Sequence, residues 1–164
     1  MAETNDSSDK IVLLLVDDQP IVAESVKRMI AEEPDFEFHY CQDPTEAVEK
    51  AENLNPTLIL QDLQMEGVDG LTLVKFYRVR EKLADVPIIV FTGTADVETK
   101  RDLFEAGAND YLIKDADKIE LIARIRLHVK SYRFFLEREE NRSKLEKSEA
   151  HLRSELAKAG EYCI

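Results

Sequence analysis

Five polar side chains that suit phosphoryl chemistry each follow a short apolar run of the sequence. They are Asp17, Asp18, Asp62, Thr92 and Lys114. Carboxylate oxygens are the ligands that Mg²⁺ prefers, and a divalent cation relieves the repulsion between close carboxylates. A cation and an ammonium beside a carboxylate nucleophile suit phosphoryl transfer, because its transition state spreads negative charge over three oxygens. If the fold brings the five together, they predict a magnesium-dependent phosphoryl-transfer site.

The apolar runs alternate with helical patterns. Strands are predicted at residues 11–16, 36–40, 57–61, 87–91 and 111–113, and helices at 20–30, 44–54, 71–82, 96–106 and from 117 onward. A continuous apolar run such as Ile11–Val16 is typical of a strand buried on both faces. Pro20 and Pro44 stand where the first turn of a helix tolerates proline. Five such units predict an α/β fold with a doubly wound five-stranded parallel sheet.

Ligands on open parallel sheets bind beyond the carboxyl ends of the strands. All five candidate residues follow predicted strands, so we expect them to converge on one sheet edge. Taken singly, each has a plainer explanation: Asp18 as a helix cap, Asp62 as a turn residue, Thr92 as a strand end and Lys114 as a solvated charge. Their joint placement favours a site.

Four segments together resemble the receiver domain of two-component response regulators. They are LLLVDDQP, LILQDLQMEGVDG, PIIVFTG and AGANDYLIK, and the resemblance covers about residues 11–130. It implies a flavodoxin-like strand order 2-1-3-4-5 with an extended C-terminal helix. It further implies that Asp62 accepts the phosphoryl group, and that Mg²⁺ is held by Asp17, Asp18, Asp62 and the backbone carbonyl of Gln64.

The resemblance also assigns a switch. Thr92 and Lys114 would bind phosphoryl oxygens, and Thr92 and Tyr111 match the family's switch pair, in which the hydroxyl moves toward the phosphoryl group and the aromatic ring turns inward. As a plain reading, Tyr111 is a core aromatic. The family is phosphorylated by a sensor histidine kinase and acts as a switch, so we expect no enzyme activity beyond assistance to its own phosphorylation and dephosphorylation.

One residue departs from the family pattern. A proline, commonly with a cis peptide, usually follows the lysine, whereas Asp115 follows Lys114 here. A cis bond before a residue other than proline costs about 2.5 to 4 kcal/mol, so we expect a trans bond or a reshaped loop. The geometry of Lys114 is the feature that this change affects.

Charge and composition divide the chain in two. Residues 1–116 carry 25 acidic and 11 basic side chains, a net charge of −14, whereas residues 117–164 carry 9 and 11, a net charge of +2. The acidic part disfavours direct nucleic-acid binding. No run is long enough to span a membrane, and no signal peptide is evident, so we expect a cytoplasmic protein. The two cysteines, Cys41 and Cys163, are read as ordinary thiols.

The chain from Asp117 to Gly160 holds no proline and no internal glycine, which predicts a helix about 66 Å long. Leucines recur at near-heptad spacing in its second half, among many charges. We therefore expect residues 1–10 to be disordered, 11–130 to form the receiver, and 131–164 to form a coiled-coil-like signalling linker in a homodimer. A single solvated helix is the alternative.

The output that this linker controls is not determined by the sequence. The receiver and helix look most like the input half of response-regulator diguanylate cyclases, although no GGDEF or GGEEF run is present. The ending ELAKAGEYCI also resembles the lead-in to PP2C-like phosphatase domains. The remaining alternatives are a stand-alone relay or scaffold protein, and a magnesium-dependent aspartyl-phosphate phosphatase of the haloacid-dehalogenase type. That phosphatase would carry Asp-x-Asp after the first strand, where this chain has Asp17-Asp18-Gln19.

Overall fold

The structure is a computed structural model and describes residues 9–93 and 96–161. Most of the N-terminal segment predicted to be disordered, together with Cys163, lies outside the described residues. The described residues up to Val129 form one compact unit, and those from Lys130 to Glu161 form a second.

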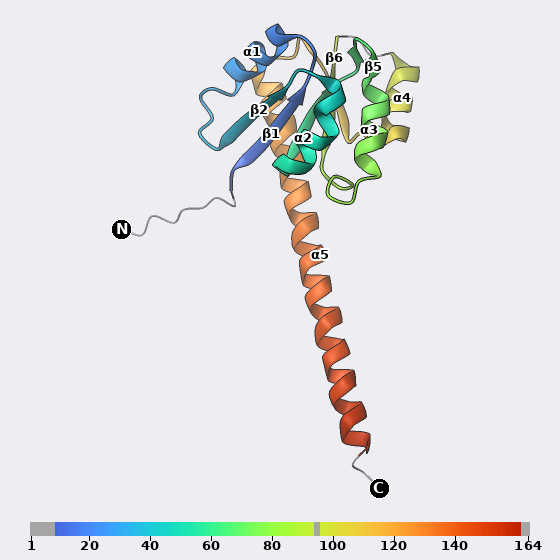
Figure 1. Cartoon of the computed structure of the whole chain (residues 1–164). Helices are drawn as coiled ribbons and strands as arrows, with labels where there is room; N and C mark the ends of the chain where they lie inside the picture. Colours follow the sequence, from blue (N-terminus) through green and yellow to red (C-terminus); the bar gives the residue numbers. More distant parts are fainter. Residues whose placement is uncertain (1–8, 94–95, 162–164) are drawn as a thin grey trace, which may run out of the picture. The chain divides into compact units, whose positions relative to one another are not determined.

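The first unit contains a five-stranded parallel sheet (Figure 1). Its strands are β1 (Ile11–Val16), β2 (Phe36–Cys41), β3 (Leu58–Asp62), β6 (Ile88–Thr92) and β7 (Asp110–Ile113), in the spatial order β2-β1-β3-β6-β7. These are the five predicted strands, with limits that differ by no more than one residue. The doubly wound fold with the order 2-1-3-4-5 is therefore confirmed.

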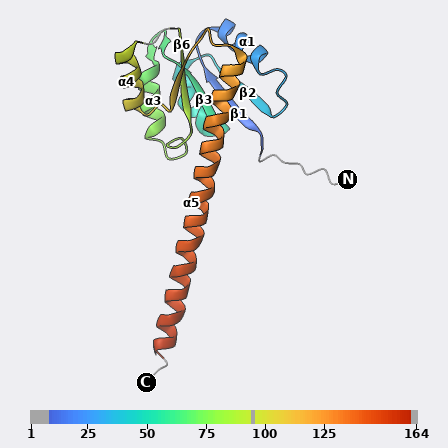
Figure 2. The same ribbon diagram turned by 180° about the vertical axis from the view of Figure 1, so that it is seen from behind.

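Helices cover both faces of the sheet, as the two ribbon views show (Figures 1 and 2). On one face lie α1 (Pro20–Met29) and the first turns of α5 (Lys118–Glu161). The other face carries α2 (Ala47–Leu54), which follows the 3-10 turn η1 (Pro44–Glu46), and then α3 (Gly70–Arg78) and α4 (Val97–Ala106). Because both faces are covered, the central strands are apolar up to their carboxyl ends, where the buried polar residues Gln61, Asp62 and Thr92 stand.

The core between the sheet and the α1/α5 layer is built from alternate residues of the central strands. Leu13, Leu15, Leu58, Leu60, Ile89 and Phe91 pack there with Val26, Leu121, Ile125 and Val129. Each of these side chains is at most 3 % exposed. The intervening strand residues face α2, α3 and α4, so every central strand is held on both sides and its carboxyl end has a fixed position.

The prediction of a helix over residues 71–82 was wrong at its C-terminal end, because α3 ends at Arg78. The Arg78 guanidinium donates to the carbonyl oxygens of Leu83, Ala84, Val86 and Gly107 and to Asn109 Oδ1, at 2.7 to 3.1 Å. These bonds gather the chain after α3 into a turn. A helix through residue 82 would place those carbonyls elsewhere, so tertiary hydrogen bonds override the local helical pattern.

Three smaller differences concern helix starts and a loop. Asp96 and Asp117, predicted as first helical residues, are caps whose carboxylates accept from the backbone N–H of Thr99 and Glu120. The predicted loop after β3 contains a short antiparallel hairpin, β4 (Gln64–Met65) with β5 (Val68–Asp69).

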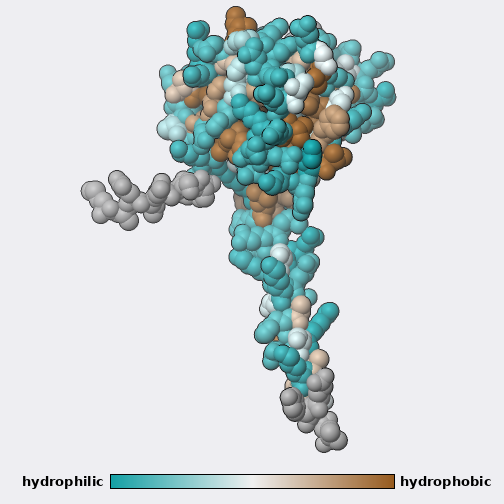
Figure 3. Space-filling model, viewed as in Figure 1, coloured by the Kyte–Doolittle hydropathy of each residue, from teal (hydrophilic) through white to brown (hydrophobic). Residues whose placement is uncertain are grey.

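The second unit is the C-terminal part of α5. Its surface is mostly hydrophilic, with scattered apolar positions (Figure 3). Leu145, Leu152 and Leu156 are about 60 % exposed. A leucine at heptad spacing that faces water is a candidate for pairing with another helix, so the coiled coil stays a prediction. None of the described helices is both long enough and apolar enough to cross a membrane.

Replacing Gly107 by alanine tests the turn that Arg78 holds. Gly107 ends α4 with a φ of 111°, and a Cβ there would lie 2.8 Å from Arg78 Cγ. We expect Gly107→Ala to lower the free energy of unfolding by about 1 to 3 kcal/mol, measured by urea denaturation. Gly93→Ala is the control, because its Cβ would meet nothing within 4 Å and its φ is not positive. Equal stability of the two variants would contradict this account.

Candidate functional site

Three carboxylates meet at the carboxyl ends of two neighbouring strands. Asp17 follows β1, and Asp62 ends β3, which pairs with β1 in a register that sets Val16 beside Gln61. One carboxylate oxygen from each of Asp17, Asp18 and Asp62 lies within 4.8 Å of the others. Asp17 and Asp62 are buried, and Asp18 is half-buried. The convergence expected from the sheet topology is present.

Lys114 reaches this cluster from the end of β7. Its Nζ lies 2.8 Å from Asp17 Oδ2 and 3.0 Å from Asp62 Oδ1. Its backbone N–H donates to the carbonyl of Thr92 at 2.8 Å, which extends the pairing of β6 with β7 past the strand ends. No cis peptide bond occurs among the described residues, so the bond to Asp115 is trans, as expected. The absence of proline at this position leaves the reach of the lysine intact.

The charges at this site are unbalanced. Burial raises the pKa of Asp62 above its ordinary value, and the charge of Asp17 adds to the rise, while the hydrogen bond from Lys114 opposes it. Burial by itself lowers the pKa of Lys114, but hydrogen bonds to Asp17 and Asp62 outweigh it and raise the pKa overall. Three close carboxylates with one ammonium form a set of hard oxygen donors with excess negative charge, which fits Mg²⁺.

Backbone N–H groups orient the three carboxylates. Gln19 N donates to Asp17 Oδ1 at 2.9 Å, Glu66 N donates to Asp18 Oδ2 at 3.0 Å, and the N–H of Gln64 bonds the carboxylate of Asp62. The cap position of α1 is Gln19, and no side chain caps that end. The plainer reading of Asp18 as a helix cap is therefore wrong. Its carboxylate instead ties the β4/β5 hairpin to the end of β1.

The two predicted switch residues lie on neighbouring strands. Thr92 is buried at the end of β6, and Tyr111 is half-buried on β7. The ring of Tyr111 packs edge-on against Phe104 of α4, with ring centroids 6.3 Å apart, and the Nζ of Lys100 lies 4.5 Å from its centroid. Tyr111 is thus held at the α4 side of β7, and the reading of this residue as a core aromatic is wrong.

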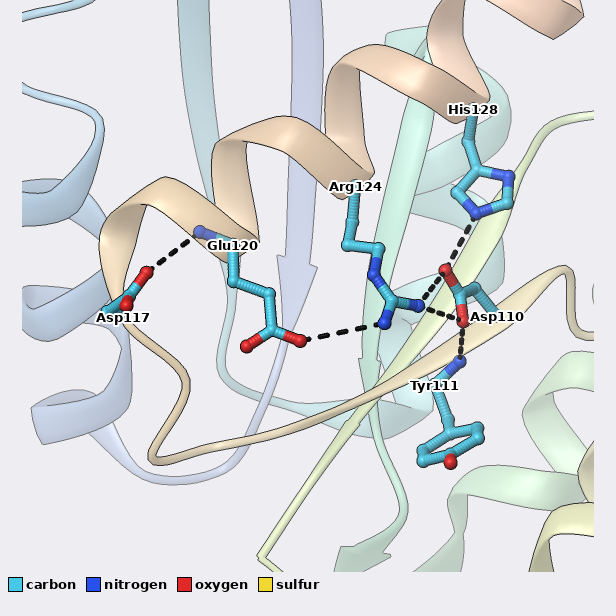
Figure 4. Close-up of polar contacts among 6 residues, drawn as sticks. All are labelled: Asp110, Tyr111, Asp117, Glu120, Arg124 and His128. Atoms are coloured by element: carbon cyan, nitrogen blue, oxygen red, sulfur yellow. Dashed lines mark hydrogen bonds and ion pairs between the residues drawn. The ribbon is translucent and has the colours of Figure 1, made fainter.

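A second polar cluster, which was not predicted from the sequence, lies between β7 and α5 (Figure 4). Asp110 accepts from Arg124 through both carboxylate oxygens at 2.9 Å, and His128 Nε2 lies 2.9 Å from its Oδ2. The N–H of Tyr111 also donates to Asp110. Arg124 and His128 are one helical turn apart on α5, a spacing that could have pointed to a shared partner. The cluster ties the residue before Tyr111 to α5.

Neutralising Asp62 tests the charge imbalance. A raised carboxyl pKa in the folded state means that ionised Asp62 destabilises the fold; this penalty is absent below the unfolded pKa near 4 and complete above the folded pKa. We expect Asp62→Asn to raise the free energy of unfolding by about 1 kcal/mol at pH 7 in EDTA, with the gain shrinking toward pH 4. A variant less stable than the wild type at pH 7 would refute this.

Comparisons with known proteins agree with the geometry. The chain is 36% identical over 117 residues to the transcriptional regulatory protein LiaR of Bacillus subtilis (strain 168), which covers 71% of this chain and 54% of that protein. It is 32% identical over 114 residues to the DNA-binding dual master transcriptional regulator RpaA of Synechocystis sp. (strain ATCC 27184 / PCC 6803 / Kazusa), covering 70% of this chain and 47% of RpaA. The chain spans about half the length of both relatives.

Solved structures are similar over the same part. A putative response regulator from Chloroflexus aurantiacus J-10-fl matches with a TM-score of 0.69 and 31% identity, covering 74% of this chain and 98% of that one. A second match is the receiver domain of sensor histidine kinase PA1611 from Pseudomonas aeruginosa PAO1, with a TM-score of 0.67 and 27% identity. The match covers 74% of this chain and 98% of that one, and that structure is described with a magnesium ion coordinated in its active site cleft. The profile of the family described as "Response regulator receiver domain" matches residues 13–126. With this match over most of its length, the chain belongs to the response regulator receiver family.

Proposed function

We propose that this chain accepts a phosphoryl group on Asp62 from a phosphohistidine of a sensor histidine kinase, with Mg²⁺ held by Asp17, Asp18, Asp62 and the carbonyl of Gln64. The observation that carries the proposal is the bridge of Lys114 Nζ to Asp17 and Asp62, at 2.8 and 3.0 Å, beside the three clustered carboxylates. We also propose that the chain, as the phosphoryl acceptor of such a kinase, acts in the cytoplasm.

Each residue has a defined part in the reaction. A carboxylate oxygen of Asp62 attacks phosphorus as the bond from phosphorus to the imidazole nitrogen breaks, and the other oxygen stays paired with Lys114. Bound Mg²⁺ supplies positive charge against the phosphoryl oxygens. The ammonium of Lys114 and the hydroxyl of Thr92 donate to those oxygens. Water hydrolyses the resulting acyl phosphate, which resets the switch.

The switch passes through Tyr111. A phosphoryl group on Asp62 adds roughly two negative charges and new acceptor oxygens, so Thr92 and Lys114 move toward it. The inward movement of Thr92 opens space into which Tyr111 turns, away from Lys100 and Phe104. This rearrangement reshapes the α4/β7/α5 surface, which carries the exposed apolar side chains Val97, Phe104, Ile113 and Ile119. We infer that two copies of the chain associate through this surface and pair their α5 helices.

The output is a separate proposal with two candidates. The resemblance of the receiver and helix favours a diguanylate cyclase, whereas LiaR and RpaA are named as transcriptional regulators, which favours a DNA-binding output. In both cases this chain is the switch and itself binds no nucleic acid, because residues 1–116 carry a net charge of −14. Phosphorylation-dependent formation of cyclic diguanylate by the intact regulator would distinguish the first candidate from the second.

Phosphorylation tests the acceptor and the metal. Treatment with acetyl phosphate and Mg²⁺ should add one phosphoryl group by intact mass, and hydroxylamine should remove it. Asp62→Asn should accept none, and Asp17→Ala or Asp18→Ala should slow the reaction and weaken Mg²⁺ binding by about 10 to 100-fold. Exposed Asp102 of α4 provides the control, since Asp102→Asn should react like the wild type.

Three outcomes would contradict the assignment. Equal phosphorylation of Asp62→Asn would remove Asp62 as acceptor. Unchanged Mg²⁺ affinity in both metal-site variants would remove Asp17 and Asp18 as ligands. Steady turnover of a phosphomonoester such as p-nitrophenyl phosphate would instead support the aspartyl-phosphate phosphatase.

Association tests the coupling of the site to the helix. Beryllofluoride with Mg²⁺ mimics the acyl phosphate, and we expect it to shift the association state in sedimentation velocity by a coupling free energy of about 1 to 3 kcal/mol. Tyr111→Ala should reduce the shift, whereas Phe76→Ala, an exposed aromatic on α3, should not. An association state that is constant across concentration, with and without the mimic, would refute the coupling and leave the phosphoryl chemistry unaffected.

A further inference from the structure

A polar pair lies inside the apolar core directly beneath the proposed site. Gln61 precedes Asp62 on β3, Tyr77 is on α3, and both are fully buried. The hydroxyl of Tyr77 donates to Gln61 Oε1 at 2.7 Å. The Nε2 of Gln61 donates to the backbone carbonyl of Asp62 at 2.9 Å and lies 3.8 Å from Met65 Sδ. Both ends of the buried amide are thus used.

The pair stands out from its surroundings. The preceding residues of β3 are Leu58, Ile59 and Leu60, all fully buried. A buried amide or phenol that lacks its hydrogen-bond partner costs about 1 to 3 kcal/mol of stability. An apolar pair would fill this space without that possible cost. Burial raises the pKa of Tyr77, which keeps its hydroxyl protonated as the donor to Gln61. The polar pair is therefore expected to hold a particular part of the backbone in place.

The part of the backbone that the pair contacts is the start of the loop after β3. Gly70 also lies close to this backbone, and a Cβ there would sit 2.0 Å from the carbonyl oxygen of Asp62 and 2.8 Å from the Cα of Leu63. The N–H of Gly70 donates to the carbonyl of Leu63 at 2.9 Å. The peptide after Asp62 is therefore in close contact with both the amide of Gln61 and the first residue of α3.

We propose that Gln61 and Tyr77 are positioning residues for phosphoryl transfer. Gln61 contacts the loop on both sides of Gln64, at Asp62 and at Met65, and Tyr77 anchors that amide to α3. Together they fix the backbone from which the Asp62 carboxylate and the Gln64 carbonyl project. Neither side chain touches a reacting atom. The inference rests on the proposed function, because it assigns these residues a role at that same site.

Two variants separate the parts of the pair. Gln61→Met keeps the length of the side chain and removes its hydrogen bonds to Tyr77, Asp62 and Met65. Tyr77→Phe removes only the bond that anchors the amide. We expect Gln61→Met to weaken Mg²⁺ binding, measured by calorimetric titration, and to slow phosphorylation by acetyl phosphate, each by about 10-fold. Tyr77→Phe should cause a smaller loss of both. Val74→Ala is the control, because Val74 is a fully buried residue of α3 that shares no hydrogen bond with the loop.

A measurement without metal makes the test independent of the proposed function. In EDTA, hydrogen exchange by NMR should be faster by about 10-fold at the amides of Glu66 and Gly70 in Gln61→Met. The hydrogen bonds from these amides to Asp18 and Leu63 form only while the loop after β3 keeps its position. The change should be absent from Val74→Ala once both variants are compared at equal global stability.

The outcomes fall on two sides. Selective loss of Mg²⁺ affinity with selective exchange at Glu66 and Gly70 supports the positioning role. Unchanged affinity, rate and exchange in Gln61→Met would overturn it, and so would equal losses in Val74→Ala, which would reduce the pair to general core stability. If wild-type protein binds no Mg²⁺ and accepts no phosphate, the proposed function fails, and the exchange result alone decides whether the pair holds the loop.

Discussion

The gathering of negative charge at the carboxyl ends of β1 and β3 is the constraint on which this site depends. Asp17 and Asp62 are buried there, and a buried carboxylate without a counter-charge is strongly destabilising. Lys114 meets part of that demand by bonding both. The remaining charge explains why a cation fits the site. It also explains the direction of the proposed switch. A phosphoryl group adds still more negative charge, so each nearby hydrogen-bond donor that moves toward it stabilises the site more.

The apolar core gives this charge cluster its geometry. The central strands are packed on both faces, so the ends of β1 and β3 are rigid, and the groups that must lie within a few ångströms of one another are placed by the sheet. The loop after β3 lacks that support. It is held instead by particular contacts: Glu66 with Asp18, Gly70 against the peptide after Asp62, and the amide of Gln61. A site of this kind needs both the rigid strand ends and the hydrogen-bonded loop.

Sequence patterns predicted what depends on local periodicity and on sheet topology. The five strands and the convergence of Asp17, Asp62 and Lys114 follow from alternating strand and helix patterns, because parallel strands end at one edge. The order of the strands was implied by the family resemblance. What the patterns missed depends on contacts between distant segments. Arg78 ends α3 through carbonyls that lie up to 29 residues away, and Gln61 sits in an apolar run with nothing local to mark its bond to Tyr77. Nothing local marks Asp110 either, because its partners Arg124 and His128 lie on α5.

The Asp110 cluster bears on how the proposed movement of Tyr111 would reach α5. Asp110 is adjacent to Tyr111 in β7, and three donors hold its carboxylate: Arg124, His128 and the N–H of Tyr111 itself. Burial alone would raise the pKa of Asp110, but the hydrogen bonds from His128 and Arg124 lower it, so the group stays ionised and the bonds persist near neutral pH. A displacement of the β7 backbone at Tyr111 must then either strain this cluster or carry the first turns of α5 with it. The Asp110 carboxylate is only 13 % exposed and Arg124 bonds both of its oxygens. Breaking the cluster would leave this carboxylate short of donors, so movement of α5 is the easier response. The same bonds that stabilise the resting fold would thereby couple the strand of the proposed switch to the helix.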